Sequence, residues 1–213
     1  SLLYKCRLLP DLWTRISEKH PELKIEILSM TEYQNRGEVF QALGIEFDLF
    51  EGIYGSTGWD GMCQFLELEH TPICCAVAKN HRLAGMKILT MQDLNGEYLV
   101  MPIEGVSKEM DAFRNHIKNN YPTIQIVDSK RYDLDIFTLC EVNGYILITQ
   151  PVYTDIHNNL VTLPLETNYT LPYGLMYANN PTSATKKFIE AITKMETTLF
   201  EHQSSVDKYL QQH

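Results

Sequence analysis

Short apolar runs alternate along this chain with segments whose apolar residues recur at helical spacing. Two such runs are ICCAVA at residues 73–78 and YLVM at residues 98–101. Helical spacing is clear near the amino end, where Leu9, Leu12 and Ile16 fall on one side of a helix. Apolar runs this short are typical of buried strands, so the alternation predicts strands and helices that follow each other along the whole chain.

The same criteria give a set of expected elements. We expect strands at residues 23–28, 45–50, 73–78, 98–101, 124–129, 145–150, 160–165 and 173–178. We expect helices at residues 8–20, 32–43, 111–119, 133–142 and 182–202, with shorter ones within 83–94, at 152–157 and from 204. The pair Asn143-Gly144 is typical of a left-handed helix stop.

Alternating strands and helices imply parallel βα units and an α/β fold. The units are too many for one small sheet, and the natural cuts fall near residues 70–75 and 163–175. We therefore expect two Rossmann-like lobes joined by two crossover strands. Lobe I would comprise residues 1–73 and 166–213, and lobe II residues 74–165. Ligands in such folds bind at the carboxyl ends of strands and between lobes.

Composition excludes several classes of protein. The net charge is −9 and no run of Lys and Arg occurs, so we expect these residues not to bind nucleic acid on their own. The five cysteines are irregularly spaced, which favours buried free thiols in the cytoplasm over a secreted disulfide framework. No stretch approaches the roughly 18 consecutive apolar residues of a membrane span. No secretion signal is recognisable at the start.

Four stretches resemble motifs of the effector-binding domain of LysR-type transcriptional regulators. RLLPDLWTRISEKHPELKIEI at residues 7–27 resembles that family's first helix and the strand after it. ALGIEFDLFEG at 42–52 resembles its L-x-x-G-x-LDLAI strand. AVAKNHRLAGMKILTMQDLNGEYLVM at 76–101 resembles its HPLA and DL segment, and EVNGYILITQP at 141–151 resembles VxxGxGIxxLP. The matches keep the family's order and spacing along nearly the whole chain.

The resemblance implies a type II periplasmic-binding-protein-like fold that binds a small-molecule effector between its lobes. The family's first strand and its N-terminal winged helix-turn-helix, which reads DNA, are expected to be missing from these residues. Some residues depart from the family pattern. Arg82 stands where proline is usual, and Gln150 replaces the leucine before Pro151. Of these departures, Gln150 could alter the pocket, as could Tyr145, where glycine is usual.

The resemblance also implies which residues bind the effector. They lie in the loop before the first helix, the loop after KIEIL, the loop after EYLVM and the turn before YILIT. The expected effector-binding residues are Ser1, Leu2, Tyr4, Ser29, Met30, Thr31, Pro102, Val106, Ser107, Asn143 and Gly144.

Physical chemistry independently supports part of this set. Ser107 is a suitable N-cap for a helix that starts near Lys108, so backbone N–H groups would face the site. Helix N-termini favour anions, which is compatible with a carboxylate effector. Glu104 lies nearby in the sequence and would repel such a ligand.

Catalytic and metal sites are not expected, and neither is a cofactor. His70, Cys74, Cys75 and His81 lack the paired spacing of zinc ligands. The glycines of GIYGSTGWDG match neither a dinucleotide fingerprint nor a P-loop. Trp59 in that loop is expected at the surface or at the rim of a cleft.

Three functions compete at this point. The first is the effector-sensing and oligomerisation domain of a bacterial cytoplasmic regulator, with DNA bound only through the missing domain and no membrane contact. The second is a free-standing periplasmic-type solute-binding protein. The third is an enzyme on the same fold, such as prephenate dehydratase, but that family's Thr-Arg-Phe motif is absent.

Assembly is expected to use the first helix. In the LysR family this helix packs against the second lobe of a partner domain. Leu9 and Trp13 are therefore expected at the interface of a homodimer, and a tetramer is expected for a full-length protein. The alternative is that Trp13 belongs to the core and the domain is a monomer.

Overall fold

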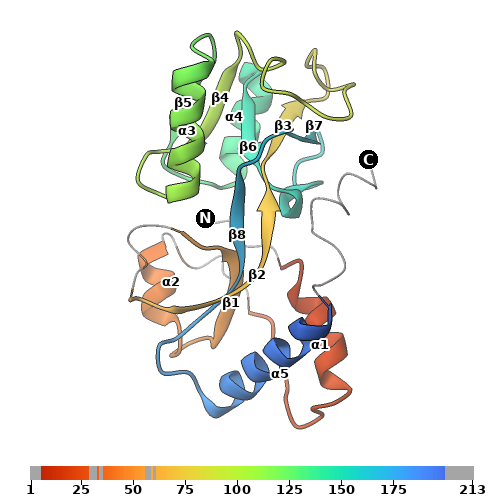
Figure 1. Cartoon of the computed structure of the whole chain (residues 1–213), viewed down its shortest axis with the longest axis vertical. Coiled ribbons are helices and arrows are strands. Elements are labelled where there is room, and N and C mark those ends of the chain that lie inside the picture. The colour runs from red at the N-terminus through yellow and green to blue at the C-terminus, as the bar shows by residue number, and fades with distance from the viewer. Residues whose placement is uncertain (1–5, 29–32, 34–35, 56–58, 60, 200–213) are drawn as a thin grey trace. The chain divides into compact units, whose positions relative to one another are not determined.

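The computed structural model describes residues 6–28, 33, 36–55, 59 and 61–199. They form two compact units (Figure 1). The chain passes from unit 1 to unit 2 within strand β2 (Gln64–Pro72) and returns within strand β8 (Thr170–Tyr177). The expected α/β class with two crossover strands is confirmed. Unit 1 takes its described residues from Ser1–Tyr54, Trp59–Glu69 and Pro172–Ser204, and unit 2 from Gly55–Gly58 and His70–Leu171.

Unit 1 is built on a three-stranded sheet with the order β1-β8-β2, in which β1 is Leu49–Ile53. Strands β1 and β8 are antiparallel, with Phe50 opposite Met176. Its helices are α1 (Leu9–Ser17), α2 (Arg36–Ala42) and α5 (Ser183–Leu199).

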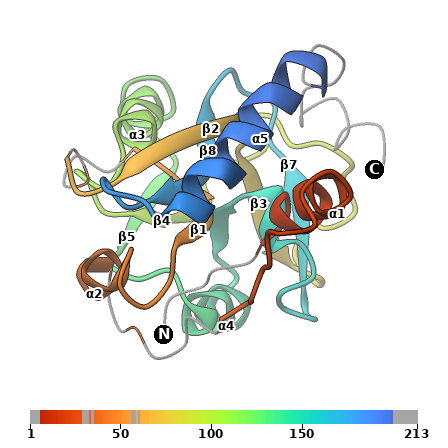
Figure 2. The ribbon, with the colours of Figure 1, turned by 90° about the horizontal axis from the view of Figure 1, so that it is seen from below.

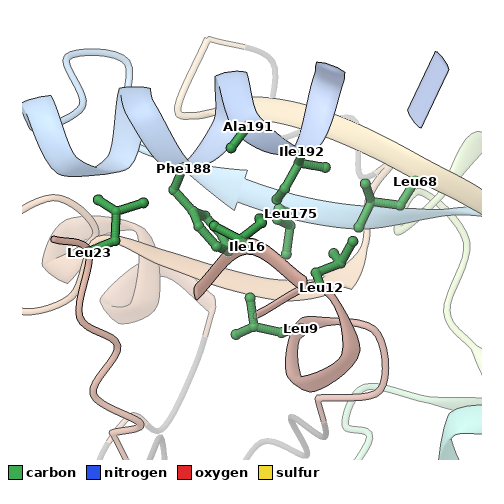
Figure 3. Close-up of a cluster of buried hydrophobic side chains, with 9 residues drawn as sticks. All are labelled: Leu9, Leu12, Ile16, Leu23, Leu68, Leu175, Phe188, Ala191 and Ile192. Carbon is green, nitrogen blue, oxygen red and sulfur yellow. The ribbon is translucent and has the colours of Figure 1, made fainter. Parts of the chain in front are cut away.

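Helices α1 and α5 share one hydrophobic core with the sheet (Figure 3). The predicted stripe of α1 is confirmed, because Leu9, Leu12 and Ile16 are all buried. They pack with Leu175 of β8 and with α5, whose contributions are Phe188, Ala191 and Ile192. Burial of each large aliphatic side chain contributes about 1.5–3 kcal/mol, so this shared core is what holds the two helices on the sheet.

The start of α1 is capped by a residue distant in sequence. Leu8 occupies the N-cap position and offers no side-chain acceptor. The buried carboxylate of Glu51 accepts instead from the backbone N–H groups of Arg7, Leu8 and Leu9, each at 2.8 Å. It also accepts from the Tyr173 hydroxyl at 2.6 Å. Negative charge at a helix N-terminus is favourable, so Glu51 ties α1 to strand β1.

Trp59 is a core residue of unit 1, and the expectation that it lies at a surface or cleft rim is wrong. Its side chain is 7% exposed and packs edge-to-face on Phe40 and Tyr54, at centroid distances of 5.0 and 5.7 Å. Phe50 joins the same cluster through Phe40. The glycine-rich sequence around Trp59 suggested a surface loop, but a ring of this size finds an apolar partner where one is available.

Residues 23–28 do not form a strand, contrary to the expectation. Leu23 is buried, whereas Ile27 and Leu28 are 74% and 47% exposed. The alternating pattern of LKIEIL specifies two faces, but a strand also needs a neighbour for its backbone N–H and C=O groups. Among the described strands of unit 1, none pairs with this segment.

The sheet of unit 2 has the strand order β5-β4-β6-β3-β7. Strand β4 runs parallel to both β5 and β6, whereas β3 is antiparallel to β6 and β7. The interior strands read as continuous apolar runs because both faces of this sheet are covered. The strands are β3 (Cys74–Ala78), β4 (Tyr98–Pro102), β5 (Gln125–Ser129), β6 (Ile146–Thr149) and β7 (Leu160–Pro164).

Two helices cover this sheet, α3 (Lys108–Asn120) and α4 (Leu134–Asn143). They lie on opposite faces of it (Figure 2). The predicted N-cap of α3 is confirmed, since the Ser107 hydroxyl accepts from the Met110 backbone N–H at 3.3 Å. The predicted stop of α4 is confirmed as well, because Gly144 has φ 66°, a left-handed conformation that glycine adopts without strain.

The segment between β3 and β4 consists of turns, so the helix expected within residues 83–94 is absent. Arg82 donates to the Glu97 carboxylate and to the Asp93 carbonyl, both at 2.6 Å. The Asp93 carboxylate in turn accepts from the backbone N–H and the hydroxyl of Thr90 at 2.7 Å. These polar contacts hold the backbone in turns, and the turns still bury Leu83, Leu89 and Leu94. The helix prediction was wrong because it rested on the spacing of apolar residues alone.

Candidate functional site

The carboxyl ends of β4 and β6 lie side by side at one edge of the unit 2 sheet, since the strands are parallel with Val100 opposite Leu147. After β4 the chain continues through α3 to β5, whereas after β6 it continues through the short helix η1 (Pro151–Tyr153) to β7. The two connections therefore leave in opposite directions. Ligands of α/β proteins commonly bind at such a point. We call the loops 102–107 and 149–153 the switch-point edge.

The structure places the predicted effector-binding residues in different positions. Pro102, Val106 and Ser107 lie at the switch-point edge. Ser1, Leu2, Tyr4, Ser29, Met30 and Thr31 lie outside the described residues.

Asn143 and Gly144 lie at the opposite edge of the sheet, because they precede β6 instead of following it. Extended along both strands, the register of β4 on β6 places Pro102 level with Thr149. Gly144 lies five residues before Thr149, which is roughly 16 Å along the strand. Tyr145 is at this far edge too, where its ring stacks on Tyr98 at 5.0 Å. We therefore leave Asn143 and Gly144 out of the site proposed below.

Groups of the chain itself bind around the N-terminus of α3. The Ser107 hydroxyl donates to the Glu109 carboxylate at 2.8 Å while it accepts from Met110. The Asp111 carboxylate accepts from the Gly105 backbone N–H at 3.0 and 3.1 Å. Two internal carboxylates thus lie beside the start of α3, where their negative charge opposes the binding of an external anion.

Gly55 fits tightly against this first turn of α3. The backbone carbonyl of Gly55 accepts from the Lys108 N–H at 3.4 Å. A Cβ atom at Gly55 would lie 2.8 Å from Oε2 of Glu109, and its φ of 128° disfavours any other residue. A side chain at position 55 would therefore displace the Glu109 carboxylate from the helix start.

Arg114 was not anticipated from the sequence, although it is the buried cation nearest this edge. It is 3% exposed, ion-pairs with Asp128 at 2.7 Å and donates to the Pro102 carbonyl. It thereby fixes the carboxyl ends of β4 and β5. A signal was present, because Arg114 interrupts the apolar stripe formed by Met110, Phe113 and Ile117.

A pair of hydroxyls lies at the carboxyl end of β6, and sequence reasoning missed it. The Tyr132 hydroxyl and the Thr149 hydroxyl are 2.6 Å apart, so one donates to the other. Thr149 is fully buried. Tyr132 is half-buried, and burial, and next the nearby Tyr153, raise the pKa of its hydroxyl well above the ordinary value. The Tyr132 hydroxyl therefore stays neutral at physiological pH, as the aliphatic hydroxyl of Thr149 does in any case.

Among residues 6–199 that the structure describes, the cysteines and histidines do not come together in a metal-binding cluster. All five cysteines are free, and burial raises the pKa of Cys63 to about 11 and that of Cys140 to about 12. Burial, with the neighbouring Cys74, raises the pKa of Cys75 further still. In the part of the chain that the structure describes, no cluster of three His, Cys, Asp or Glu side chains could hold a metal ion. Within the same ranges, no helix is long and apolar enough to cross a membrane.

The two residues expected at a dimer interface differ in their surroundings. Leu9 is 7% exposed and belongs to the core of unit 1, so it has little surface left for a partner. Trp13 is half-buried and packs against Phe188 at a centroid distance of 6.3 Å. Only Trp13 retains surface that a partner could cover.

No protein-family model matches the sequence, and no curated protein is significantly similar to it. Solved structures do match. The BenM effector-binding domain with its effector benzoate is 19% identical, with a TM-score of 0.61 over 93% of this chain and 90% of that one. The regulatory domain of CcmR from Synechocystis PCC6803, in complex with 2-PG, is 14% identical, with a TM-score of 0.57 over 90% and 92%.

Full-length CbnR, a LysR family transcriptional regulator solved in complex with its target DNA, gives a TM-score of 0.62 at 14% identity. The match covers 88% of this chain and 65% of the CbnR chain. At these identities the likeness establishes the fold. The chain has the type II periplasmic-binding-protein-like fold of LysR effector-binding domains, as the sequence motifs predicted.

Proposed function

We propose that this chain is the effector-sensing domain of a bacterial LysR-type transcriptional regulator, and that it is a binding module instead of an enzyme. One observation carries the proposal: 90–93% of the chain shares its fold with regulatory domains solved in complex with 2-PG and with benzoate. A small metabolite binds at the switch-point edge and controls DNA binding by an N-terminal domain. Such a regulator acts in the cytoplasm, where five free thiols remain reduced.

The loops of the switch-point edge suit such a ligand. Polar side chains follow two neighbouring strands here, with Ser107 in the loop after β4 and Thr149 at the end of β6. Both residues are anchored by hydrogen bonds to their own unit, so the polar groups are preorganised. A ligand that binds one arrangement of these loops more tightly shifts the population toward it.

A thermal-shift screen of small metabolites tests the site. We expect a hit to raise the melting temperature, and Ser107→Trp to abolish that rise because the indole fills the edge. Asn143→Trp, at the opposite edge of the sheet, is the matched control and should keep the full response. Circular dichroism would verify that both variants are folded. Equal ligand responses in the two variants would place the site elsewhere.

The alternative function is a free-standing periplasmic-type solute-binding protein, which would share this fold. The coding sequence immediately upstream distinguishes the two. A winged helix-turn-helix would support the regulator, and a secretion signal would support the solute-binding protein. We favour the regulator because the HRLA and QDL segment fits that family.

DNA contact is proposed to depend on the N-terminal domain alone. The chain carries a net charge of −9, which opposes binding to phosphate backbones. A mobility-shift titration at physiological salt should show no sequence-specific complex with these 213 residues. A saturable complex that is lost on a scrambled DNA site would contradict this assignment.

We also propose a two-fold homodimer of the domain, and a tetramer of the full-length protein. Trp13 provides one contact surface on α1. Helix α4 provides an apolar outer face, on which Leu134, Leu139 and Val142 are 48%, 42% and 76% exposed. Exposed aliphatic side chains grouped on one helix face are typical of a protein interface, so we propose that α1 of one copy packs on α4 of the other.

Sedimentation equilibrium at micromolar concentration tests this arrangement. Trp13→Glu and Val142→Glu should each convert the dimer to a monomer, because a buried, unpaired carboxylate opposes association. Asn119→Glu adds the same charge at an exposed residue of α3, outside the proposed interface, and should leave the dimer intact. A wild-type monomer, or a dimer that survives both substitutions, would refute the interface.

A further inference from the structure

Arg114 is a buried cation in the apolar stripe of α3. It is 3% exposed and lies between the buried side chains of Phe113 and Ile117 in the sequence of that stripe. Its Nη1 atom is 2.7 Å from the Asp128 carboxylate, and its Nη2 atom donates to the Pro102 carbonyl. Its Nε atom is buried and has no hydrogen-bonding partner among the residues that the structure describes. A buried charge with an unsatisfied donor destabilises a fold, so an apolar residue would suit stability better here.

The counter-ion of Arg114 does not share its burial. The Asp128 side chain is 59% exposed, whereas that of Arg114 is 3% exposed. Water can therefore solvate the Asp128 carboxylate when the guanidinium is absent. The buried guanidinium has no second ion-pair partner within the described part of the chain. Removal of Arg114 and removal of Asp128 should thus have opposite effects on stability.

The contact with Pro102 restrains the start of the loop 102–107. The Pro102 carbonyl and the Ile103 N–H belong to one peptide group. The carbonyl accepts from Arg114, while the N–H donates to the Ser129 carbonyl of β5 at 3.0 Å. Rotation of this peptide group would break at least one of the two hydrogen bonds. Arg114 and β5 together therefore fix the direction in which the chain leaves β4.

We infer that Arg114 is a positioning residue of the switch-point edge, which holds the loop 102–107 in its binding conformation at the expense of stability. The inference rests on the proposed effector-binding function of this edge. Arg114 acts through the Pro102 carbonyl and does not touch a ligand, because its guanidinium is enclosed. Groups that bind a ligand must be held within about 0.5 Å of their productive positions by residues behind them. Ser107, which ends the loop and caps α3, is the group supported in this way.

Melting temperatures test whether Arg114 serves stability or position. Arg114→Met introduces an unbranched apolar side chain, so its melting temperature should equal that of wild type or exceed it by up to about 4 °C. Asp128→Ala leaves the buried guanidinium without its carboxylate and should lower the melting temperature by about 5 °C. Lys118→Met is the control on the same helix. It removes an exposed ion pair with Glu104 at 3.7 Å and should change the melting temperature by less than about 1 °C.

Amide hydrogen exchange, followed by two-dimensional NMR well below the melting temperature, tests the order of the loop. The amides of Ile103 and Gly105 should exchange about tenfold faster in Arg114→Met, the effect of one lost restraining hydrogen bond. Arg114→Lys keeps the positive charge but lacks the planar fork that reaches two partners at once, so it should show the same increase. The amides of Ala76 in β3 and Leu147 in β6 are internal references and should be unchanged in every variant.

The outcomes separate this inference from the proposed function, because none of these measurements needs a ligand. A melting temperature of Arg114→Met below the range set by the Lys118→Met control would show that Arg114 serves stability, and would overturn the inference. Unchanged exchange at Ile103 and Gly105 in both Arg114 variants would overturn it as well. If the loop results are as expected but no metabolite shifts NMR signals from residues 102–107 or 149–153, the proposed function fails while the control of the loop by Arg114 stands.

Discussion

Glu51 shows how one residue joins distant parts of unit 1. Its carboxylate lies in strand β1, yet it accepts three backbone N–H groups at the start of α1 and the hydroxyl of Tyr173 in β8. Local sequence at α1 offers no capping side chain, since Leu8 and Leu9 precede Pro10. The cap could not be predicted from the sequence, because its two parts are 42–44 residues apart.

Replacement of this carboxylate should destabilise the domain strongly. Glu51→Gln keeps the shape but substitutes an NH₂ group for one acceptor oxygen, which leaves buried donors without a partner. We expect a loss of about 3 kcal/mol in the free energy of unfolding, measured by urea titration. Glu166→Gln, on an exposed residue, is the control and should stay within about 0.5 kcal/mol of wild type. A loss below about 1 kcal/mol for Glu51→Gln would mean that the cap contributes little.

The cysteines give a prediction about pH. Reaction with Ellman's reagent requires the thiolate, and burial raises the pKa of Cys63 to about 11 and of Cys140 to about 12. Only Cys6 is exposed, and its pKa is raised by partial burial and then by Glu51. We therefore expect one thiol to react slowly in the native protein, and its reaction to become faster as the pH rises above about 8. After denaturation, all five thiols should react. Two or more fast thiols in the native state would contradict the described burial.

Asp48 connects the segment before β1 to the start of helix α5. The FDLF stretch places Asp48 just before β1, where its carboxylate accepts from the Thr182 and Thr185 hydroxyls at 3.1 and 2.9 Å. The Thr182 hydroxyl also accepts from the Thr185 N–H at 3.2 Å, as an N-cap does. Asp48 thereby fixes the start of α5, the helix that completes the core with α1.

Removal of this carboxylate should loosen α5. We expect Asp48→Ala to lower the free energy of unfolding by about 1–2 kcal/mol, as loss of a helix cap does. Asp48→Asn retains an acceptor oxygen and should lose less than half as much. Urea titration monitored by circular dichroism measures both variants. Equal losses in the two would show that charge, and not the hydrogen bonds, holds the helix.

The elements that the sequence predicted well are those whose own residues fix them. Helix α3 has its N-cap at Ser107, and α4 has Gly144 at its stop, so both were located correctly. Strand β3 is continuously apolar and was found for the same reason. The expected strand at 23–28 and the expected helix within 83–94 failed because each depended on partners outside the segment: a neighbouring strand in one case, and the Arg82 contacts in the other.

At the scale of the molecule, the sequence predicted the fold and one side of the candidate site. The four motifs led to the right fold because they keep their order along nearly the whole chain. Ser107 was found through capping chemistry, whereas the Tyr132 and Thr149 pair was missed because strand pairing brings it together. Asn143 and Gly144 were placed at the site by resemblance, although they lie at the far end of β6.

A small molecule is proposed to bind at the carboxyl ends of β4 and β6. Two-dimensional amide NMR of the isotope-labelled chain, recorded during a metabolite screen, can locate that molecule. We expect a hit to shift backbone signals of residues 102–107 and 149–153 together and to leave those of residues 143–145 unchanged. Shifts centred on residues 143–145, or a complete screen without a hit at either edge, would contradict it.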